Sequence, residues 1–210
     1  MWDEVDTEPV LRARNLTFRY RPHGRAILRD VDLDIYAGDR LLLQGPSGGG
    51  KTTLAAMLAG LRPPETGLVM LRGFDQQNVE SQVTPRRVAM APQFHENYIF
   101  NATFGFNLLL GRRWPPLPQD VSDALEICNE LGLDELLARM PLGMNQIVGE
   151  SGWQLSHGER SRVYIARVLV QNADLVILDE SFGALDPENL RDALQTTLHR
   201  AKTLLVIAHP

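Results

Sequence analysis

The stretch GPSGGGKT, from Gly45 to Thr52, has the residue types and spacing of a loop that wraps a chain of phosphates. Its consecutive glycines let the backbone turn sharply and approach an anion closely. Lys51 can reach the terminal phosphates as a point charge, and the Thr52 hydroxyl can ligate Mg²⁺. A glycine-rich turn before a helix is the alternative, but the flanking strand and helix patterns favour a nucleotide site. The residues expected to bind the nucleotide here are Gly45, Pro46, Ser47, Gly48, Gly49, Gly50, Lys51, Thr52 and Thr53.

Two acids end the apolar run DLVILDE, from Asp174 to Glu180. Such a run predicts a buried parallel strand, and open α/β sheets bind ligands at the carboxyl ends of their strands. Asp179 could hold a Mg²⁺ that bridges two phosphates, and Glu180 could polarise an attacking water. Two solvated acids at a strand end are the alternative. The phosphate loop upstream favours the functional interpretation.

The segment LSHGER, from Leu155 to Arg160, supports two interpretations. Ser156 with Glu159 three residues later predicts a capping box at the start of a helix. The same helix N-terminus would offer N–H groups and a positive dipole to an anion, and Gly158 would let a phosphate come close. We expect both interpretations to hold.

Strands and helices alternate around these residues, which predicts an α/β fold with a mixed core sheet around the phosphate loop. Residues 40–44 (RLLLQ) and 203–209 (TLLVIAH) read as buried strands. Residues 51–61 and 156–172 read as helices. The helix that follows the phosphate loop would aim its N-terminal dipole at the phosphates.

An antiparallel β edge is predicted before the phosphate loop. Residues 10–20 and 27–36 alternate apolar and polar side chains, as half-exposed antiparallel strands do. Tyr20 ends the first of these strands beside a turn, and its ring could stack on an adenine. Ordinary packing of an aromatic residue on the sheet is the alternative.

The character of the chain changes after Gln93. Helical patterns and a proline-rich loop (RRWPPLPQ, residues 112–119) indicate an inserted helical subdomain. We therefore expect the antiparallel edge and the phosphate-loop part of the core in residues 1–93. The helical subdomain would take residues 94–155, and the rest of the α/β core residues 156–210.

Composition narrows the class of protein. The 210 residues carry a net charge of −5 with a pI near 5.5, which argues against a general nucleic-acid binder. The single cysteine, Cys128, excludes an internal disulfide and reads as a small apolar residue on a helix. The acidic N-terminus is unlike a signal peptide, and no uncharged apolar run is long enough to cross a bilayer.

Taken in order, these motifs resemble those of the nucleotide-binding domain of ATP-binding cassette (ABC) proteins, over nearly the whole chain. The phosphate loop is similar to the Walker A motif, Gln93 to the Q-loop, and LSHGER to the signature motif. LVILDE resembles the Walker B strand, residues 184–186 the D-loop, and His209 the switch histidine. The signature departs from the common LSGGQ at His157 and Glu159.

The resemblance implies a Mg²⁺-dependent ATPase. Thr52, Gln93 and Asp179 would lie near the metal ion, and Glu180 would be the general base. His209 would contact the γ-phosphate. The implied catalytic residues are Glu180, His209 and Gln93, and the implied nucleotide contacts outside the phosphate loop are Tyr20, Ser156, Gly158 and Asp186. Each of these also has a simpler interpretation, such as a polar strand end for Gln93 or a helix N-cap for Asp186, which Pro187 follows.

Family partners are implied as well. ABC domains form head-to-tail dimers with a second nucleotide-binding domain and dock on a transmembrane domain. VGESG (residues 148–152) resembles a loop of ABC exporters, although a glycine-rich linker is the alternative. The apolar cluster after Gln93 occupies the region that receives the coupling helix of the membrane domain, and some of it would be subdomain core. This cluster comprises Phe94, Tyr98, Ile99, Phe100, Phe104 and Phe106.

The function implied is ATP hydrolysis that powers export, at the cytoplasmic face of a membrane. The chain ends one residue after His209, whereas family domains continue, so we expect a piece of a longer polypeptide with its membrane domain on the N-terminal side. A non-transport ABC ATPase acting on DNA or ribosomes is the alternative. A nucleotide-binding regulatory module without turnover is disfavoured by Glu180 and His209.

Overall fold

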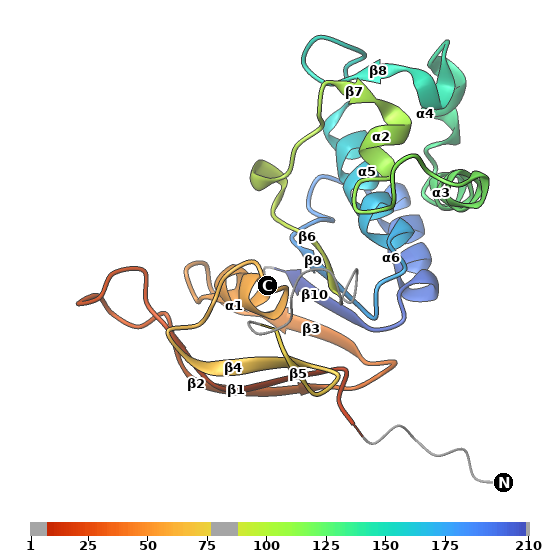
Figure 1. The fold of residues 1–210 in the computed structure, drawn as a ribbon. Coiled ribbons are helices and arrows are strands. Elements are labelled where there is room, and N and C mark those ends of the chain that lie inside the picture. Colours follow the sequence, from red (N-terminus) through yellow and green to blue (C-terminus); the bar gives the residue numbers. More distant parts are fainter. Residues whose placement is uncertain (1–7, 77–87, 209–210) are drawn as a thin grey trace, which may run out of the picture. The chain divides into compact units, whose positions relative to one another are not determined.

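The computed structural model describes residues 8–76 and 88–208 (Figure 1). Its contacts divide the chain into two compact units, each of which is described by itself. The first unit gathers the described residues within 1–90, 174–179 and 202–210, and the second gathers residues 91–173 and 180–201. The helical region expected at residues 94–155 lies within the second unit.

An antiparallel sheet forms one side of the first unit, with the strand order β2-β1-β4-β5. Its strands are β1 (Leu11–Phe18), β2 (Leu28–Ile35), β4 (Thr66–Leu71) and β5 (Phe74–Asp75). Both β2 and β4 pair with β1 in antiparallel register. The expectation of two half-exposed antiparallel strands before the phosphate loop is confirmed.

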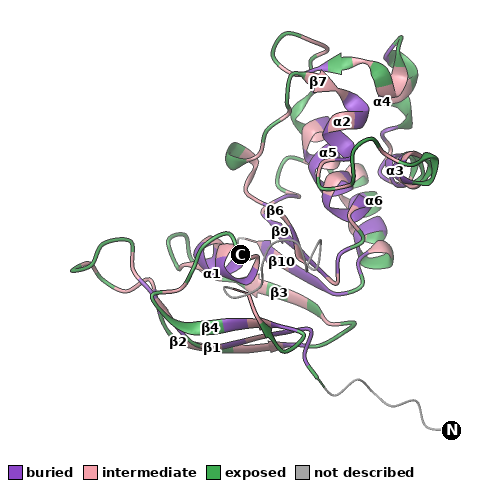
Figure 2. Cartoon of the chain, viewed as in Figure 1, coloured by how far each residue is buried: buried purple, intermediate pink, exposed green. Residues whose placement is uncertain are grey.

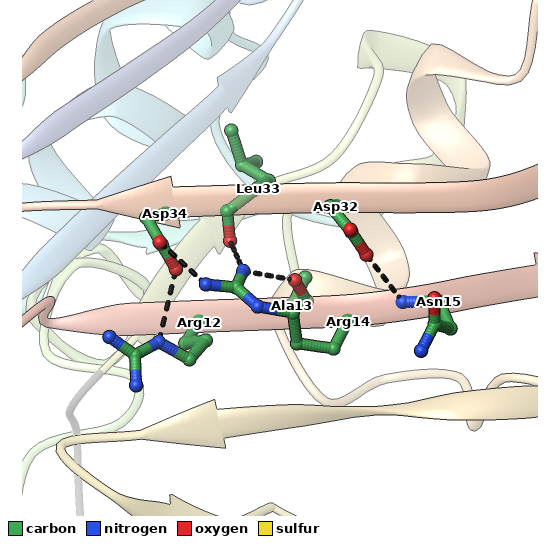
Figure 3. Close-up of polar contacts among 7 residues, drawn as sticks. All are labelled: Arg12, Ala13, Arg14, Asn15, Asp32, Leu33 and Asp34. Atoms are coloured by element: carbon green, nitrogen blue, oxygen red, sulfur yellow. Dashed lines mark hydrogen bonds and ion pairs between the residues drawn. The ribbon is translucent and has the colours of Figure 1, made fainter.

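Charged pairs hold the outer surface of this sheet, as Figure 3 shows. Arg14 and Arg12 both reach the carboxylate of Asp34, at 2.6 and 3.2 Å. The hydrogen bond from Arg14 is the main reason that the pKa of Asp34 lies below its usual value. The regular register of β1 is broken after Ala13, and there the N–H of Asn15 donates to the carboxylate of Asp32 at 2.7 Å. Side chains of β2 thus hold the irregular part of β1 in place.

A second sheet has the strand order β3-β10-β9-β6. Its strands are β3 (Arg40–Gln44), β10 (Leu204–Ala208), β9 (Leu175–Asp179) and β6 (Val88–Ala91). β10 pairs in parallel with both β3 and β9. Every residue of β9 is buried, which confirms the buried strand predicted to end at the two acids.

The prediction that residues 40–44 form a buried strand is wrong in one respect. The strand forms, but it lies at the edge of the sheet, and Leu42 is 59% exposed. Within the part of the chain that the structure describes, β3 has β10 as its one neighbour. The consecutive apolar residues of β3 therefore alternate between partly buried and exposed positions.

Helix α1 (Lys51–Leu58) begins directly after the phosphate loop and lies over the antiparallel sheet (Figure 1). Its residues Leu54, Met57 and Leu58 belong to one buried cluster with apolar residues of β1, β2 and β4. The same cluster includes apolar residues of β9 and β10. Residues of both sheets thus share one buried core with α1.

The second unit is built around helix α5 (His157–Val170), which carries many of its buried residues (Figure 2). Helices α2 (Phe104–Leu108), α3 (Pro118–Glu130) and α6 (Pro187–Arg200) all contact α5. The remaining elements are α4 (Asp134–Arg139), the two-stranded sheet of β7 (Ala102–Thr103) and β8 (Ile147–Val148), and the 3-10 turns at residues 94–96 and 143–145.

Cys128 lies buried on α3, as expected for a small apolar residue, and burial raises the pKa of its thiol to about 12. No helix formed by the described residues combines the length and the apolar character needed to cross a membrane.

Candidate nucleotide site

Lys51 holds its charge inside the phosphate loop. Its Nζ donates to the carbonyl oxygens of Gly45 (2.8 Å) and Pro46 (3.0 Å), and the residue is only 9% exposed. An ammonium group has three donors, so it can bind the loop and still reach an oxygen of a ligand. The cation therefore lies where the sequence predicts phosphates.

The start of α1 is suited to an anion. Gly50 is its N-cap, with φ 86°. A Cβ there would lie 2.9 Å from Cγ2 of Ile27, so this position needs glycine for both conformation and space. The first turn contains no acid, and among the described residues no side chain caps it. Its N–H groups and dipole are thus directed toward the loop, as a phosphate requires.

Asp179 ends β9 in the first unit and is completely buried. Helix α1, which carries Thr52 in its first turn, contacts β9. A carboxylate and a hydroxyl are hard oxygen ligands of the kind that Mg²⁺ prefers, so these residues fit the ion. The described residues include no cluster of three or more His, Cys, Asp or Glu side chains that could hold a metal. Mg²⁺ commonly completes its coordination with waters and substrate phosphates, which suits this donor set.

Two of the predicted catalytic residues meet in the second unit. The side-chain amide of Gln93 donates to Oε1 of Glu180 at 3.0 Å. Glu180 has φ 51°, a left-handed conformation that is uncommon for a residue with a side chain. The third predicted catalytic residue, His209, lies outside the described residues.

The predicted capping box at the start of α5 is confirmed. The N–H of Ser156 donates to Oε2 of Glu159 (2.7 Å), and the N–H of Glu159 donates to Oγ of Ser156 (3.2 Å). Because Oγ accepts this bond, the hydroxyl proton of Ser156 can point toward a ligand. A Cβ on Gly158 would meet the nearest atom, the Ala184 carbonyl oxygen, at 3.7 Å, an ordinary contact. The fold therefore has room for a side chain at position 158, and the close approach of a phosphate stays a prediction.

Asp186 acts as the N-cap of α6. Its carboxylate accepts hydrogen bonds from the N–H groups of Glu188 (3.2 Å) and Asn189 (3.1 Å) and from the side-chain amide of Asn189 (2.6 Å). The bonds from Asn189 contribute most to lowering its pKa. The capping interpretation is confirmed, and the nucleotide contact stays a prediction.

Tyr20 lies beside α1 in the first unit. It is 60% exposed, and its hydroxyl shares a hydrogen bond of 2.9 Å with Oγ1 of Thr53. Its ring meets Phe18 edge to face, and the guanidinium of Arg62 lies 5.1 Å from the ring centre. The sequence gives no signal for Arg62, because a lone arginine after a helix has many uses.

A cavity of about 280 Å³ lies in the second unit between residues 94–100, which we call the docking segment, and the VGESG loop. Its lining includes Phe94, Tyr98 and Ile99 from the first and Gly149 from the second. Ser151 of the loop donates its N–H to the side chain of Asn101 at 3.0 Å. The segment that the resemblance linked to a membrane partner and the loop that it linked to exporters thus line the same cavity.

The apolar cluster after Gln93 divides between core and surface. Phe104 is completely buried, so for this residue the core interpretation is correct. Tyr98 and Phe100 are 67% and 50% exposed. Phe94 stacks on His157 of the signature motif at 5.3 Å between ring centres.

Side chains of α5 hold the docking segment in place, which the sequence did not reveal. Arg167 donates to the side chain of Asn97 (2.9 Å) and to the carbonyl of Tyr98 (3.0 Å). Tyr164 donates its hydroxyl to the carbonyl of Asn97 (3.1 Å). Burial lowers the pKa of Arg167 to about 10. Helix α5, which begins at the signature motif, therefore also holds residues that line the cavity.

Comparison with known proteins gives consistent results. Residues 28–183 match the family model described as "ABC transporter". The chain is 36% identical, over 99% of its length, to the mycobactin import ATP-binding/permease protein IrtB of Mycolicibacterium thermoresistibile. It is also 36% identical, over 95% of its length, to the ATP-dependent lipid A-core flippase of Ralstonia nicotianae. It covers 35% and 33% of these relatives, about a third of their length.

Among solved structures, a bacterial Atm1-family ABC exporter with ATP bound is similar to 97% of the chain. The TM-score is 0.83, the sequence identity is 31%, and 35% of the exporter chain is covered. The predicted α/β fold is thereby confirmed.

Proposed function

The chain belongs to the ABC transporter family, and from this premise we propose that it binds and hydrolyses ATP with Mg²⁺ to drive transport through a membrane-spanning partner. The observation that carries the proposal is Lys51, enclosed by the phosphate loop at the N-terminus of α1, in the same unit as the buried Asp179. A cation, the N–H groups of a helix N-terminus and a carboxylate that could hold Mg²⁺ are features of a site that stabilises phosphoryl transfer.

Each residue has a proposed role in the reaction. Lys51 and the loop backbone bind the phosphates, and Thr52, Asp179 and Gln93 approach the metal. Bound Mg²⁺ would neutralise charge that develops on the phosphates. Glu180 accepts a proton from the attacking water, and its bond to Gln93 orients the carboxylate. His209 is proposed as the γ-phosphate contact, and the exposed ring of Tyr20 as the adenine platform.

Transport is favoured over action on DNA or ribosomes by the cavity between the exposed aromatic segment and the VGESG loop. We propose that a helix of a transmembrane partner docks there, which would place the chain at the cytoplasmic face of a membrane. The relatives whose printed names include the word permease or flippase support a membrane partner in the same polypeptide. We propose export as the direction, on the exporter-like structure, although the printed name of IrtB says import.

The active site would be completed by a second copy or a related cassette in a head-to-tail dimer. The signature motif of one chain, Ser156 and Gly158, would then close over nucleotide bound at the partner's phosphate loop. In a two-fold dimer this arrangement gives two equivalent composite sites.

Mixing two inactive variants tests the proposal. Lys51→Ala and Ser156→Arg should each abolish ATP hydrolysis that the unmodified chain performs. In a mixed dimer one site collects both changes and the other is intact, so mixing should restore up to roughly a quarter of the activity. Absence of hydrolysis by the unmodified chain would contradict the ATPase. Hydrolysis without recovery, at concentrations where mixed dimers form, would contradict the composite site alone.

A further inference from the structure

The signature motif carries an acid where the common motif of the family has glutamine. Glu159 is only 8% exposed, and it lies in the first turn of α5. An acid there interacts favourably with the helix dipole. It also places a negative charge close to the N–H groups that would face a phosphate of the partner chain, which opposes anion binding.

A cation from another helix meets this acid. Arg139, the last residue of α4, forms an ion pair with Oε1 of Glu159. The other oxygen, Oε2, accepts from the N–H of Ser156. One carboxylate thus connects the end of α4 to the residue that is expected to touch the phosphate.

The other arginines near the start of α5 donate to backbone carbonyls. Arg160 donates to the carbonyl of Leu155 at 3.2 Å, and Arg162 donates to that of Gly132 at 2.7 Å. Arg139 instead reaches the carboxylate itself. Burial raises the pKa of Glu159, but the bonds from Ser156 and Arg139 outweigh burial and hold it below the usual value. Glu159 is therefore an ionised group that needs a cation beside it.

We propose that Arg139 is a positioning residue for the signature motif, which acts through Glu159 to hold Ser156 and to offset the acid's charge. This inference rests on the composite site proposed above. It assigns a function in hydrolysis to α4, which contributes no motif residue. The acid at position 159, where the common motif has glutamine, would then depend on Arg139 for its compensating charge.

The mixing experiment tests this proposal, because the same change can be placed in either chain of the mixed dimer. In a Lys51→Ala and Ser156→Arg dimer, the working site uses the signature of the Lys51→Ala chain. Adding Arg139→Ala to that chain should lower the recovered activity by about tenfold. Adding it to the Ser156→Arg chain, whose signature is already inactive, should leave the recovery unchanged. Equal losses in both placements would show a merely structural effect and overturn the proposal.

Three further variants make the test more specific. In a Glu159→Gln background, which removes the charge, Arg139→Ala should change hydrolysis by less than about twofold. Arg139→Lys should recover part of the loss, because it keeps the cation. Arg200→Ala is the matched control, since Arg200 pairs with Glu130 in the same unit without touching the signature. A tenfold loss in the Glu159→Gln background, or with Arg200→Ala, would contradict the proposal.

If the original mixture recovers no activity, the composite site itself has failed and this inference falls with it. If the mixture recovers and both Arg139→Ala placements are harmless, the composite site stands and only the function of Arg139 is wrong. The two failures are therefore distinguishable.

Discussion

At the scale of single residues, Glu180 combines strain with a specific partner. A left-handed conformation costs a residue with a side chain about 1–2 kcal/mol, and glycine would avoid this cost. Such strain persists where the surroundings determine the conformation, and it concentrates at functional sites. The bond from Gln93 fixes the carboxylate that this conformation presents.

Glu180→Gln should separate binding from turnover. The new amide oxygen can still accept the bond from Gln93, but the side chain can no longer take a proton from water. Hydrolysis should fall by roughly 10²-fold or more, while ATP binding measured by calorimetry stays within about twofold. The control is Glu188→Gln, which changes an exposed acid at the start of α6. Undiminished turnover in Glu180→Gln would show that another group is the base.

At the scale of elements, the irregular part of β1 depends on a glycine of its neighbour. Gly67 on β4 has φ 90°, and a Cβ there would lie 2.4 Å from the carbonyl oxygen of Arg14 and 2.5 Å from that of Asn15. Both neighbours are backbone atoms of β1, which β2 holds through Asp32. The strand cannot move away without breaking this contact.

Gly67→Ala should therefore destabilise the fold by about 3 kcal/mol or more, from the left-handed conformation and overpacking together. Gly73→Ala is the matched control, because Gly73 has φ 79° but open space around its Cβ position. That change should cost only about 1–2 kcal/mol. The free energy of unfolding from denaturant titration measures both. Equal costs would show that the close approach to β1 does not constrain the sheet.

Local patterns explain which elements could be predicted. The alternation in residues 10–20 and 27–36, the apolar run before Asp179 and the capping box at Ser156 each contain their own signal, and each is confirmed. The prediction that residues 40–44 are buried was wrong, because the burial of a strand depends on which strands lie beside it. No local pattern contains that information.

The residues of the candidate site also divide into those that the sequence predicted and those that it could not. Motif patterns predicted Lys51 and Glu180, and the family resemblance predicted Gln93, each with the chemistry expected of it. The contacts of Arg139 and Arg167 could not be predicted. Each is a single arginine on a helix, and the residue that it binds lies 20 or more positions away in the sequence. Only the packing of α4 and α5 shows which oxygen atoms they reach.

At the scale of the whole molecule, the proposed functions divide between the two units. The phosphate loop and Asp179 belong to the first unit, whereas the signature motif and the docking cavity belong to the second. Within the second unit, α5 begins at the signature and fixes the docking segment through Tyr164 and Arg167. One helix thus connects the surface proposed for the partner's nucleotide to the surface proposed for the membrane domain.

Tyr98 offers a test of the docking surface, because its ring is exposed while its backbone is held by Arg167. In a transporter that joins this chain to its membrane partner, Tyr98→Ser should weaken docking roughly 5- to 30-fold, as loss of an aromatic anchor does. Hydrolysis by the separate chain should be unaffected. Stimulation of hydrolysis by the partner should fall accordingly.

Phe74→Ser is the matched control, since Phe74 is also a largely exposed aromatic residue (60%) but lies on β5 of the first unit. It should leave stimulation by the partner unchanged, because loss of an exposed ring has no general effect on coupling. If Phe74→Ser impairs stimulation as much as Tyr98→Ser does, the effect is nonspecific. If neither change matters, the cavity beside the VGESG loop is not where the membrane partner binds, and the function of Arg167 and Tyr164 is limited to packing the second unit.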